Sequence, residues 1–321
     1  MKHVGIKVLA ALGLLFALSP AVPASADQVK VSYLYDLSDF MGIVPYDGAN
    51  VFLDKDGRDI FTVSGGEQTV QIFNGSGMQV FSFGDDGSLG NINIYDGAVD
   101  DDGNIILLAY ANAGGARKYM LLLCDYRGGL KAKVELAGVP AEFSGITPGR
   151  LVYKDGRLYL ADMNSLKVLV VKEDGSYITG YDIQSVLKLS DKEVAGSGMA
   201  GFSVDKDGDL LFTIPVLFTA YRLTPELKVS SFGKPGGKQG KFGVIGGIAS
   251  DGNGFYYVVD TLKCNVMVFD SNYEFQAEFG GFGYGTGDLI APRGIAIDKS
   301  GRVYVSQGGN RGVSVYGVTY N

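Results

Sequence analysis

The chain has 321 residues, a formal net charge of −7 at pH 7 and no tryptophan. Its acidic balance argues against a general nucleic-acid binder, because such proteins carry a basic patch that attracts phosphates. Its single histidine, His3, lies at the very start of the chain.

The first 26 residues have the pattern of a secretory signal peptide. Two lysines precede an apolar run over residues 8–18, and Ala-Ser-Ala at 24–26 forms a small-residue cleavage site. That run is too short to span a membrane. The residues around the cleavage point include no cysteine, so a lipid anchor is not expected. We therefore predict cleavage after Ala26 and a mature protein in the periplasm or outside the cell.

Cleavage would leave a mature chain without histidine. This excludes a Ser-His-Asp triad, a Cys-His dyad and any zinc site that needs imidazole ligands. The cysteines Cys124 and Cys264 are flanked by strand-like residues, and the chain has no Cys-x-x-Cys-His motif. We expect buried free thiols and no covalent c-type haem.

Six copies of one pattern follow the leader and a first predicted strand at 29–36. Each copy has an apolar run, a glycine turn, a second apolar run, a polar loop and a third run. The turn glycines are spaced 46 to 53 residues apart: Gly57, Gly103, Gly156, Gly208, Gly254 and Gly301. That period fits a four-stranded propeller blade of about 40–50 residues, and the period-two alternation indicates half-buried strands.

The predicted fold is all-β: a six-bladed β-propeller of four-stranded blades over residues 27–321. Blades are expected at about 45–84, 94–136, 145–183, 198–233, 244–280 and 290–318. The sixth copy ends after its third strand. We therefore expect the strand within 27–38 to pair as the outer strand of the last blade, which closes the ring and removes an exposed edge.

Two smaller features complete the pattern. A second set of glycines precedes each first strand and is expected to permit close backbone approach near the axis: Gly48, Gly97, Gly149, Gly201, Gly247 and Gly294. Helical periodicity is nearly absent, and its best candidate is the segment 184–194.

Charges are expected to divide between the two faces of the ring. We call the face with the turns between first and second strands the turn face. The loop face carries the loops between second and third strands and the connections between blades. Aspartates such as Asp54, Asp100 and Asp205 predict a uniformly acidic turn face, although turn chemistry alone explains them and is the preferred interpretation. The loop face is expected to be mixed, with a basic sector.

The last two copies resemble NHL repeats. The resemblance rests on residues 291–306 (Ala-Pro-Arg-Gly-Ile-Ala-Ile-Asp-Lys-Ser-Gly-Arg-Val-Tyr-Val-Ser), on 309–316, and on the equivalent segments 258–261 and 266–270. It spans roughly 45–318, and NHL chains of six repeats form six-bladed propellers. It implies a non-catalytic protein-binding scaffold without a cofactor, expected to be a monomer. Secreted bacterial NHL proteins are often found with envelope assemblies, including multihaem cytochrome systems, which makes such assemblies the predicted partner class.

The predicted binding residues lie on the loop face. The cations expected to steer and contact a partner are Arg117, Lys118, Lys241, Lys263, Arg293 and Arg311, and the aromatic anchors are Tyr95, Phe242 and Tyr284. The glycine-rich segment 233–241 is expected to be a flexible connection with three exposed lysines.

Two other functions stay open. Gluconolactonase-like propellers hold Ca²⁺ or another divalent ion with Glu, Asn and Asp oxygens, so a Ca²⁺-dependent lactonase or related hydrolase is one alternative. Its candidate ligands are Asp96, Asn112, Asp162, Asn164, Asp260 and Asn310. Asp162 and Asp260 share one phase of the repeat, which favours a structural capping role, and no Glu is placed as that family needs. The other alternative is a small-ligand sensor that uses the central channel.

A further relative is excluded by composition. Peptide-amidating lyases share the propeller and use a histidine-ligated metal, so a mature chain without histidine cannot run that chemistry in their way.

Overall fold

The structure is a computed structural model that describes residues 29–43, 49–64, 66–84, 89, 92–196 and 198–320. The predicted signal peptide and its cleavage point lie outside these residues, as does Gly48. A search of the described helices finds none with the length and apolarity that a bilayer crossing requires.

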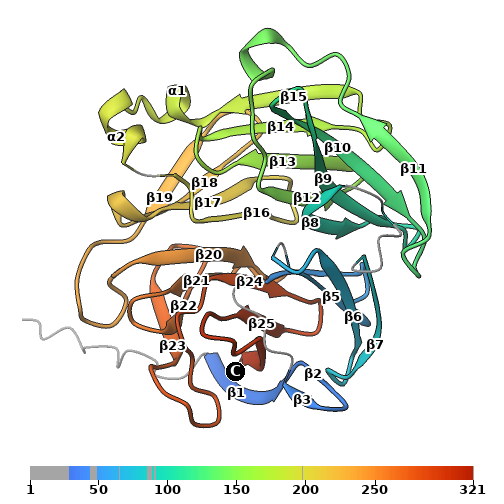
Figure 1. Cartoon of the computed structure of the whole chain (residues 1–321). Coiled ribbons are helices and arrows are strands. Elements are labelled where there is room, and N and C mark those ends of the chain that lie inside the picture. The colour runs from blue at the N-terminus through green and yellow to red at the C-terminus, as the bar shows by residue number, and fades with distance from the viewer. Residues whose placement is uncertain are drawn as a thin grey trace, which may run out of the picture.

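Within the described residues, six four-stranded antiparallel sheets stand around an axis as the blades of a propeller (Figure 1). Blade 1 consists of β4 (Asn50–Leu53), β5 (Asp59–Ser64), β6 (Thr69–Asn74) and β7 (Gln79–Phe83). Blade 2 consists of β8 (Asn93–Val99), β9 (Ile105–Ala113), β10 (Ala116–Cys124) and β11 (Leu130–Glu135). Blade 3 consists of β12 (Arg150–Lys154), β13 (Arg157–Asp162), β14 (Lys167–Val171) and β15 (Tyr177–Asp182).

The remaining blades repeat this order from the axis outward. Blade 4 consists of β16 (Gly201–Val204), β17 (Leu210–Ile214), β18 (Thr219–Leu223) and β19 (Val229–Phe232). Blade 5 consists of β20 (Ile245–Ser250), β21 (Tyr256–Asp260), β22 (Asn265–Phe269) and β23 (Phe275–Gly280). Blade 6 contains β24 (Gly294–Ile297), β25 (Arg302–Ser306) and β26 (Val313–Tyr320).

The N-terminal strand closes the ring, as the strand count predicts. β1 (Val29–Asp36) pairs antiparallel with β26, in a register that runs from Val29↔Tyr320 to Asp36↔Ser314. Blade 6 therefore has the order β1-β26-β25-β24, with both ends of the described chain in one sheet. Figure 1 shows β1 beside the C-terminus.

The turns between first and second strands use the predicted residues. All six turn glycines have φ between +65° and +88°, a conformation that glycine adopts without a side-chain clash. Oδ1 of Asp100 accepts hydrogen bonds from the backbone N–H groups of Asp102 and Asn104, at 2.9 and 2.8 Å. The same bonds, from N–H groups two and four residues ahead, recur at Asp205, Asp251 and Asp298. Turn geometry therefore accounts for these aspartates.

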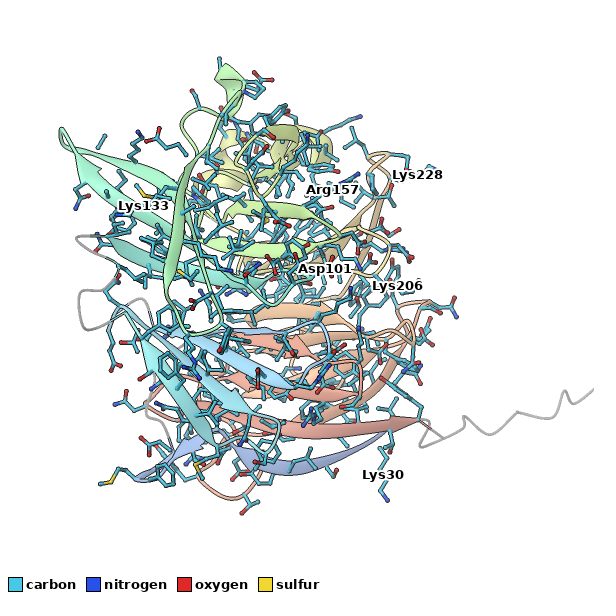
Figure 2. All side chains as sticks on the ribbon, turned by 90° about the vertical axis from the view of Figure 1, so that its right-hand side faces the viewer. Lys30, Asp101, Lys133, Arg157, Lys206 and Lys228 are labelled. Carbon is cyan, nitrogen blue, oxygen red and sulfur yellow. The ribbon has the colours of Figure 1, made fainter. Side chains whose placement is uncertain are left out.

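The turn face is not uniformly acidic, contrary to expectation. Figure 2 shows Lys206 and Lys228 on one side of the ring, in the β16–β17 and β18–β19 turns. Lys206 pairs with Asp207 and Lys55 with Asp101, each at 2.8 Å. Lysines interspersed among the aspartates therefore neutralise part of this face.

The glycines at the first strands differ in how closely other backbone atoms approach them. A Cβ built at Gly201 would lie 2.4 Å from the carbonyl oxygen of Gly246, and one at Gly247 would lie 2.8 Å from that of Arg293. Backbone approach thus excludes a side chain at both positions. At Gly149 the nearest atom, Cγ of Met163, would lie at 3.7 Å, so close approach does not explain that glycine.

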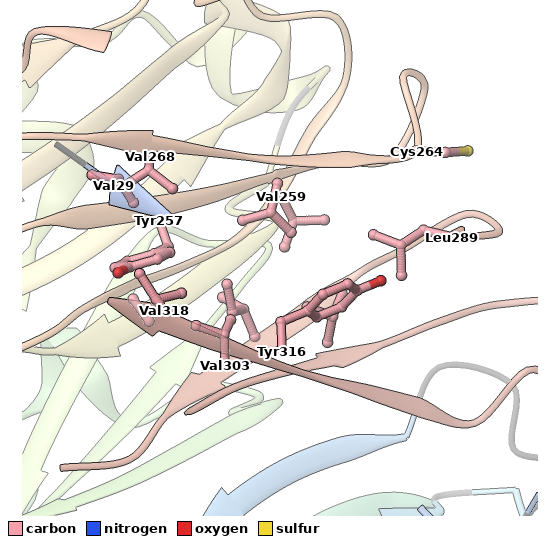
Figure 3. Close-up of a cluster of buried hydrophobic side chains, with 13 residues drawn as sticks. Val29, Tyr257, Val259, Cys264, Val268, Leu289, Val303, Tyr316 and Val318 are labelled. Atoms are coloured by element: carbon pink, nitrogen blue, oxygen red, sulfur yellow. The ribbon is translucent and has the colours of Figure 1, made fainter. Parts of the chain in front are cut away.

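Much of the core lies between neighbouring blades. In Figure 3, Tyr257 and Val259 of β21 pack with Val303 of β25 and Val318 of β26 across the boundary of blades 5 and 6. Val29 of β1 belongs to the same cluster. Burying an apolar side chain of this size stabilises a fold by about 1.5–3 kcal/mol. Because Val29 comes from the closing strand, that strand also stabilises the interface between blades 5 and 6.

Departures from the six-fold pattern are short. The predicted helical segment forms two single-turn helices, α1 (Ile183–Leu187) and α2 (Asp191–Ala195). A two-stranded hairpin, β2 (Ser38–Asp39) with β3 (Gly42–Ile43), follows the closing strand. Two 3-10 turns lie at Ala141–Phe143 and Pro215–Leu217. The repeats therefore account for nearly all of the described chain.

Both cysteines are buried free thiols, as expected. Cys124 and Cys264 belong to different hydrophobic clusters, in blades 2 and 5. Burial raises the pKa of Cys124 to about 11. A thiol with so high a pKa is largely protonated at neutral pH and is a poor nucleophile.

Candidate functional site

Four loops of the loop face over blades 5 and 6 are joined into one surface. They are the connection 233–244, the β21–β22 loop, the connection 281–293 and the β25–β26 loop. The N–H of Thr261 donates to the carbonyl of Val244 at 2.8 Å, and its hydroxyl donates to the carbonyl of Pro292 at 2.7 Å. The N–H of Gly308 donates to the carbonyl of Ile290 at 3.0 Å. These bonds hold the loops in fixed positions.

This surface exposes four large apolar side chains. Leu262 is 69% exposed, Phe282 and Tyr284 are each 75% exposed, and Val244 is 45% exposed. None of the four lies in a strand, so the alternation of the sheets does not account for them.

Cations stand among these apolar side chains. Arg293 is exposed, and Lys241 is partly exposed. The guanidinium of Arg311 lies 5.8 Å from the centre of the Tyr284 ring, and its buried Nε has no hydrogen-bond partner among the described residues. We call Lys241, Val244, Leu262, Phe282, Tyr284, Arg293 and Arg311 the blade 5–6 patch.

Two predicted contact residues have other roles. Phe242 is completely buried, with its ring centre 6.2 Å from that of Phe232 and 5.6 Å from that of Phe269. It cannot serve as an exposed anchor. The ammonium of Lys263 donates to the carbonyls of Lys238 and Lys241, at 2.9 and 2.5 Å. Lys263 therefore fastens the glycine-rich connection, which we had expected to be flexible.

The other predicted contact residues form a separate group in blade 2. The guanidinium of Arg117 lies 4.7 Å from the centre of the Tyr110 ring and donates to the hydroxyl of Tyr95 at 3.3 Å. Lys118 pairs with Glu135 at 2.6 Å. Blade 2 stands across the ring from blade 5 (Figure 1), so the nine predicted residues do not form one surface.

Sequence reasoning missed Val244, Leu262 and Phe282. Each lies just outside a predicted strand, where no alternation demands an apolar residue. Phe282 stands between two glycines in Gly-Phe-Gly-Tyr-Gly. An aromatic residue inside a glycine-rich connection was the signal available from sequence.

The structure does not assemble the predicted metal ligands. They belong to four blades, and the described residues contain no group of three or more acidic, histidine or cysteine side chains suited to a metal. Asn112 is exposed in the β9–β10 hairpin, and Asn310 is exposed after β25. Asp96 lies in β8, with its side chain 3.5 Å from Arg150.

Asp162 and Asp260 cap loops, as the repeat phase favours. The carboxylate of Asp162 accepts from the N–H groups of Asn164 and Thr147, at 3.0 and 2.8 Å. That of Asp260 accepts from the N–H groups of Gly243 and Lys263, at 2.6 and 3.0 Å. These backbone bonds occupy oxygen atoms that a metal would need.

Comparison with known proteins supports the fold. No protein-family model matches the chain. A 75-residue stretch is 41% identical to part of RING finger protein nhl-1 of Caenorhabditis elegans, and it covers 23% of this chain and 8% of that protein. The chain thus matches a small fraction of that relative's length.

Two solved structures illustrate the structural likeness. A protein of unknown function from Bacteroides thetaiotaomicron has a TM-score of 0.64 at 13% identity, over 91% of this chain and 76% of that one. A gluconolactonase from Xanthomonas campestris has a TM-score of 0.57 at 14% identity, over 91% and 90% of the two chains. At such low identity the likeness is one of fold. The chain is a six-bladed β-propeller.

Proposed function

We propose that this chain is an NHL-type propeller without catalytic activity that binds a protein partner through the blade 5–6 patch. One observation carries the proposal: four large apolar side chains, 45% to 75% exposed, and three cations lie on the same set of hydrogen-bonded loops. Apolar patches with a charged rim are typical of interaction sites. Because the loops are already fixed, binding would cost little ordering entropy.

Three observations support the NHL assignment. The last two repeats carry the pattern at 258–270 and 291–316, and the local match is to a protein whose name includes nhl-1. The blade number agrees with six repeats.

The patch indicates the chemistry of its partner. Its charged members are all cations, so a complementary surface would place acidic residues around an apolar centre. Together with the leader pattern at 1–26, this leads us to propose a partner in the cell envelope or extracellular space. An acidic protein of an envelope assembly, such as one with multihaem cytochromes, fits this description.

Site-specific photocrosslinking tests the proposal. A photoreactive residue is placed at Phe282, and a matched one at Tyr126, which is 65% exposed in a turn of blade 2. After irradiation of native cells, we expect a discrete crosslinked protein from position 282 and none from 126. Identification by mass spectrometry should show a protein with acidic surface residues.

Charge reversal provides the second arm. Lys241→Glu, Arg293→Glu and Arg311→Glu together should reduce the crosslink from position 282 at least tenfold. Reversal of Lys30, Lys133 and Lys228, which are exposed elsewhere on the ring (Figure 2), makes the same change in net charge and should leave it intact. Equal yields from positions 282 and 126, or equal losses in both triple variants, would contradict the proposal.

A further inference from the structure

A channel runs along the propeller axis between the inner strands of the six blades. Its middle is a cavity of about 220 Å³ whose wall is half polar and half apolar, the apolar part including Leu151, Phe202 and Ile295. A second cavity of about 150 Å³ lies at the loop-face end and shares Arg150, Phe202 and Ile295 with the first. The two cavities therefore adjoin one another.

Two arginines from different blades line the loop-face cavity. Arg150 begins β12, and its Nε lies 3.5 Å from Oδ2 of Asp96, whose side chain is 2% exposed. The same oxygen accepts from the N–H of Leu151 at 2.8 Å. Asp96, predicted as a metal ligand, is thus a brace for the Arg150 side chain.

The second arginine carries an unpaired charge. Arg293 directly precedes β24 and is exposed, and its side chain forms no ion pair or hydrogen bond with any described residue. Of the two positive charges, that of Arg150 is offset by the carboxylate of Asp96, and that of Arg293 has no such partner among the described residues. The loop-face cavity therefore has a net positive lining.

A polar group deeper in the channel is also unpartnered. Oγ of Ser203, in β16, is buried and has no hydrogen-bond partner among the described residues, and Ser203 lines the middle cavity. A buried polar group left unsatisfied costs about 1–3 kcal/mol.

The turn-face mouth has a different charge pattern. Its cavity of about 350 Å³ is lined by three lysines and four aspartates: Lys55, Lys154, Lys299, Asp54, Asp101, Asp155 and Asp298. Lys55 pairs with Asp101 at 2.8 Å, and Lys154 with Asp155 at 3.5 Å. Positive charge is therefore neutralised here, and the channel attracts anions from the loop face.

We propose that the loop-face half of the channel binds a small organic monocarboxylate. Its carboxylate would lie between Arg150 and Arg293, because guanidinium groups match the planar oxygens of a carboxylate. Its apolar body would extend along the axis past Phe202 toward Ser203. An inorganic anion would leave the apolar wall unused, and a neutral analogue would leave the positive charge unpaired.

This site shares Arg293 with the docking surface proposed above and is otherwise distinct from it. Its ligand contacts the inner strands, whereas the partner contacts side chains on outer loops. Arg293 alone belongs to both, and Leu262→Ser separates them, since Leu262 does not line the channel. That variant should weaken the crosslink and leave carboxylate binding unchanged.

Calorimetric titration of the chain from Asp27 onward tests the proposal. The probes are butyrate, hexanoate and benzoate, and the controls are their amides and inorganic phosphate. We expect at least one carboxylate to bind at least tenfold more tightly than its own amide and than phosphate. The proposal is overturned if each acid binds no more tightly than its amide or than phosphate. It is also overturned if none of the three carboxylates binds, in which case the channel holds only water.

Variants locate the carboxylate. Arg293→Gln keeps the Arg150–Asp96 pair, so the fold should persist while affinity for the bound carboxylate falls at least tenfold. Lys154→Gln, at the turn-face mouth, makes the same change in charge and should leave affinity unchanged. An equal loss in both variants, or no loss in Arg293→Gln, overturns the assignment.

Discussion

At the scale of single residues, the turn aspartate is a stabilising device that recurs from blade to blade. It satisfies two backbone N–H groups in a tight turn, and at Asp298 it does more. Oδ2 of Asp298 accepts from Nε of Arg302 at 2.7 Å, while the other guanidinium nitrogens donate to the carbonyls of Gly57 and Gly75, at 2.9 and 2.7 Å. One carboxylate thus orients an arginine that joins blade 6 to blade 1. Asp298 therefore stabilises both its own turn and the contact between blades 6 and 1.

Asp298→Asn should therefore destabilise the protein by about 1.5–3 kcal/mol at pH 7, the range for hydrogen bonds to charged groups. Asparagine can still accept the turn N–H bonds but loses the ionic bond to Arg302. Urea unfolding measures the difference. Asp56→Asn is the control, because Asp56 is exposed and its ion-pair partners among the described residues are the exposed Arg58 and Lys299. It should change stability by less than about 0.5 kcal/mol.

The effect should depend on pH in a defined direction. Burial acts to raise the pKa of Asp298, but hydrogen bonds from Ser300 and Arg302 outweigh it and hold the pKa below its usual 3.8. The stabilisation is therefore present above that value and is lost as pH falls through the lowered pKa. The gap between wild type and Asp298→Asn should be constant from pH 7 to 5 and shrink toward pH 2.5. A gap that widens in acid would contradict this account.

At the scale of elements, the closing strand joins the two ends of the described chain in one sheet. β1 supplies the outer edge of blade 6, and Leu37, just beyond it, is 1% exposed in the core near β4 and β26. The N–H of Leu37 donates to the carbonyl of Val313 at 2.9 Å. A segment far from blade 6 in sequence is therefore part of its fold.

Leu37→Ala should lower the free energy of unfolding by about 2–5 kcal/mol, the range for truncating a buried leucine. Leu34→Ala is a matched control, because Leu34 lies in β1 itself but is 42% exposed. Thermal unfolding followed by circular dichroism compares the two. Deletion of 27–38 should destabilise the protein further, and a peptide of that sequence added in trans should restore part of the loss. Equal melting temperatures for the two alanine variants would refute the closure model.

At the scale of the whole molecule, the two faces differ in how their polar groups are used. Turn-face aspartates bond to their own turns and pair with neighbouring lysines. Loop-face groups over blades 5 and 6 leave apolar side chains and guanidinium groups facing outward. Both proposed sites therefore lie on the loop face.

Divalent metal ions should leave stability unchanged. The carboxylates of Asp162 and Asp260 are engaged by backbone N–H groups, and the six candidate ligands are spread over four blades. Differential scanning calorimetry with Ca²⁺, Mg²⁺ and Mn²⁺ at millimolar concentration measures this. A native-state metal site would add about 2.7 kcal/mol at a hundredfold excess over its Kd. A clear rise in melting temperature with one ion would instead revive the metal-dependent hydrolase.

The architecture was accessible from sequence because it is periodic. Six glycine turns spaced 46 to 53 residues apart, strands of period two and a missing fourth strand predict six blades and their closure. These features are local: each follows from the conformation that glycine, aspartate and β-branched residues adopt within a few positions. The structure confirms them, including the pairing of β1 with β26.

The candidate sites were decided by tertiary structure. Whether Phe242 lies inside or outside depends on Phe232 and Phe269, which come from different strands. Whether Lys263 is free depends on two carbonyls more than twenty residues away. The patch and the arginine-lined channel form only where residues of separate blades come together. Burial and charge pairing depend on those contacts between blades, and no single repeat determines them.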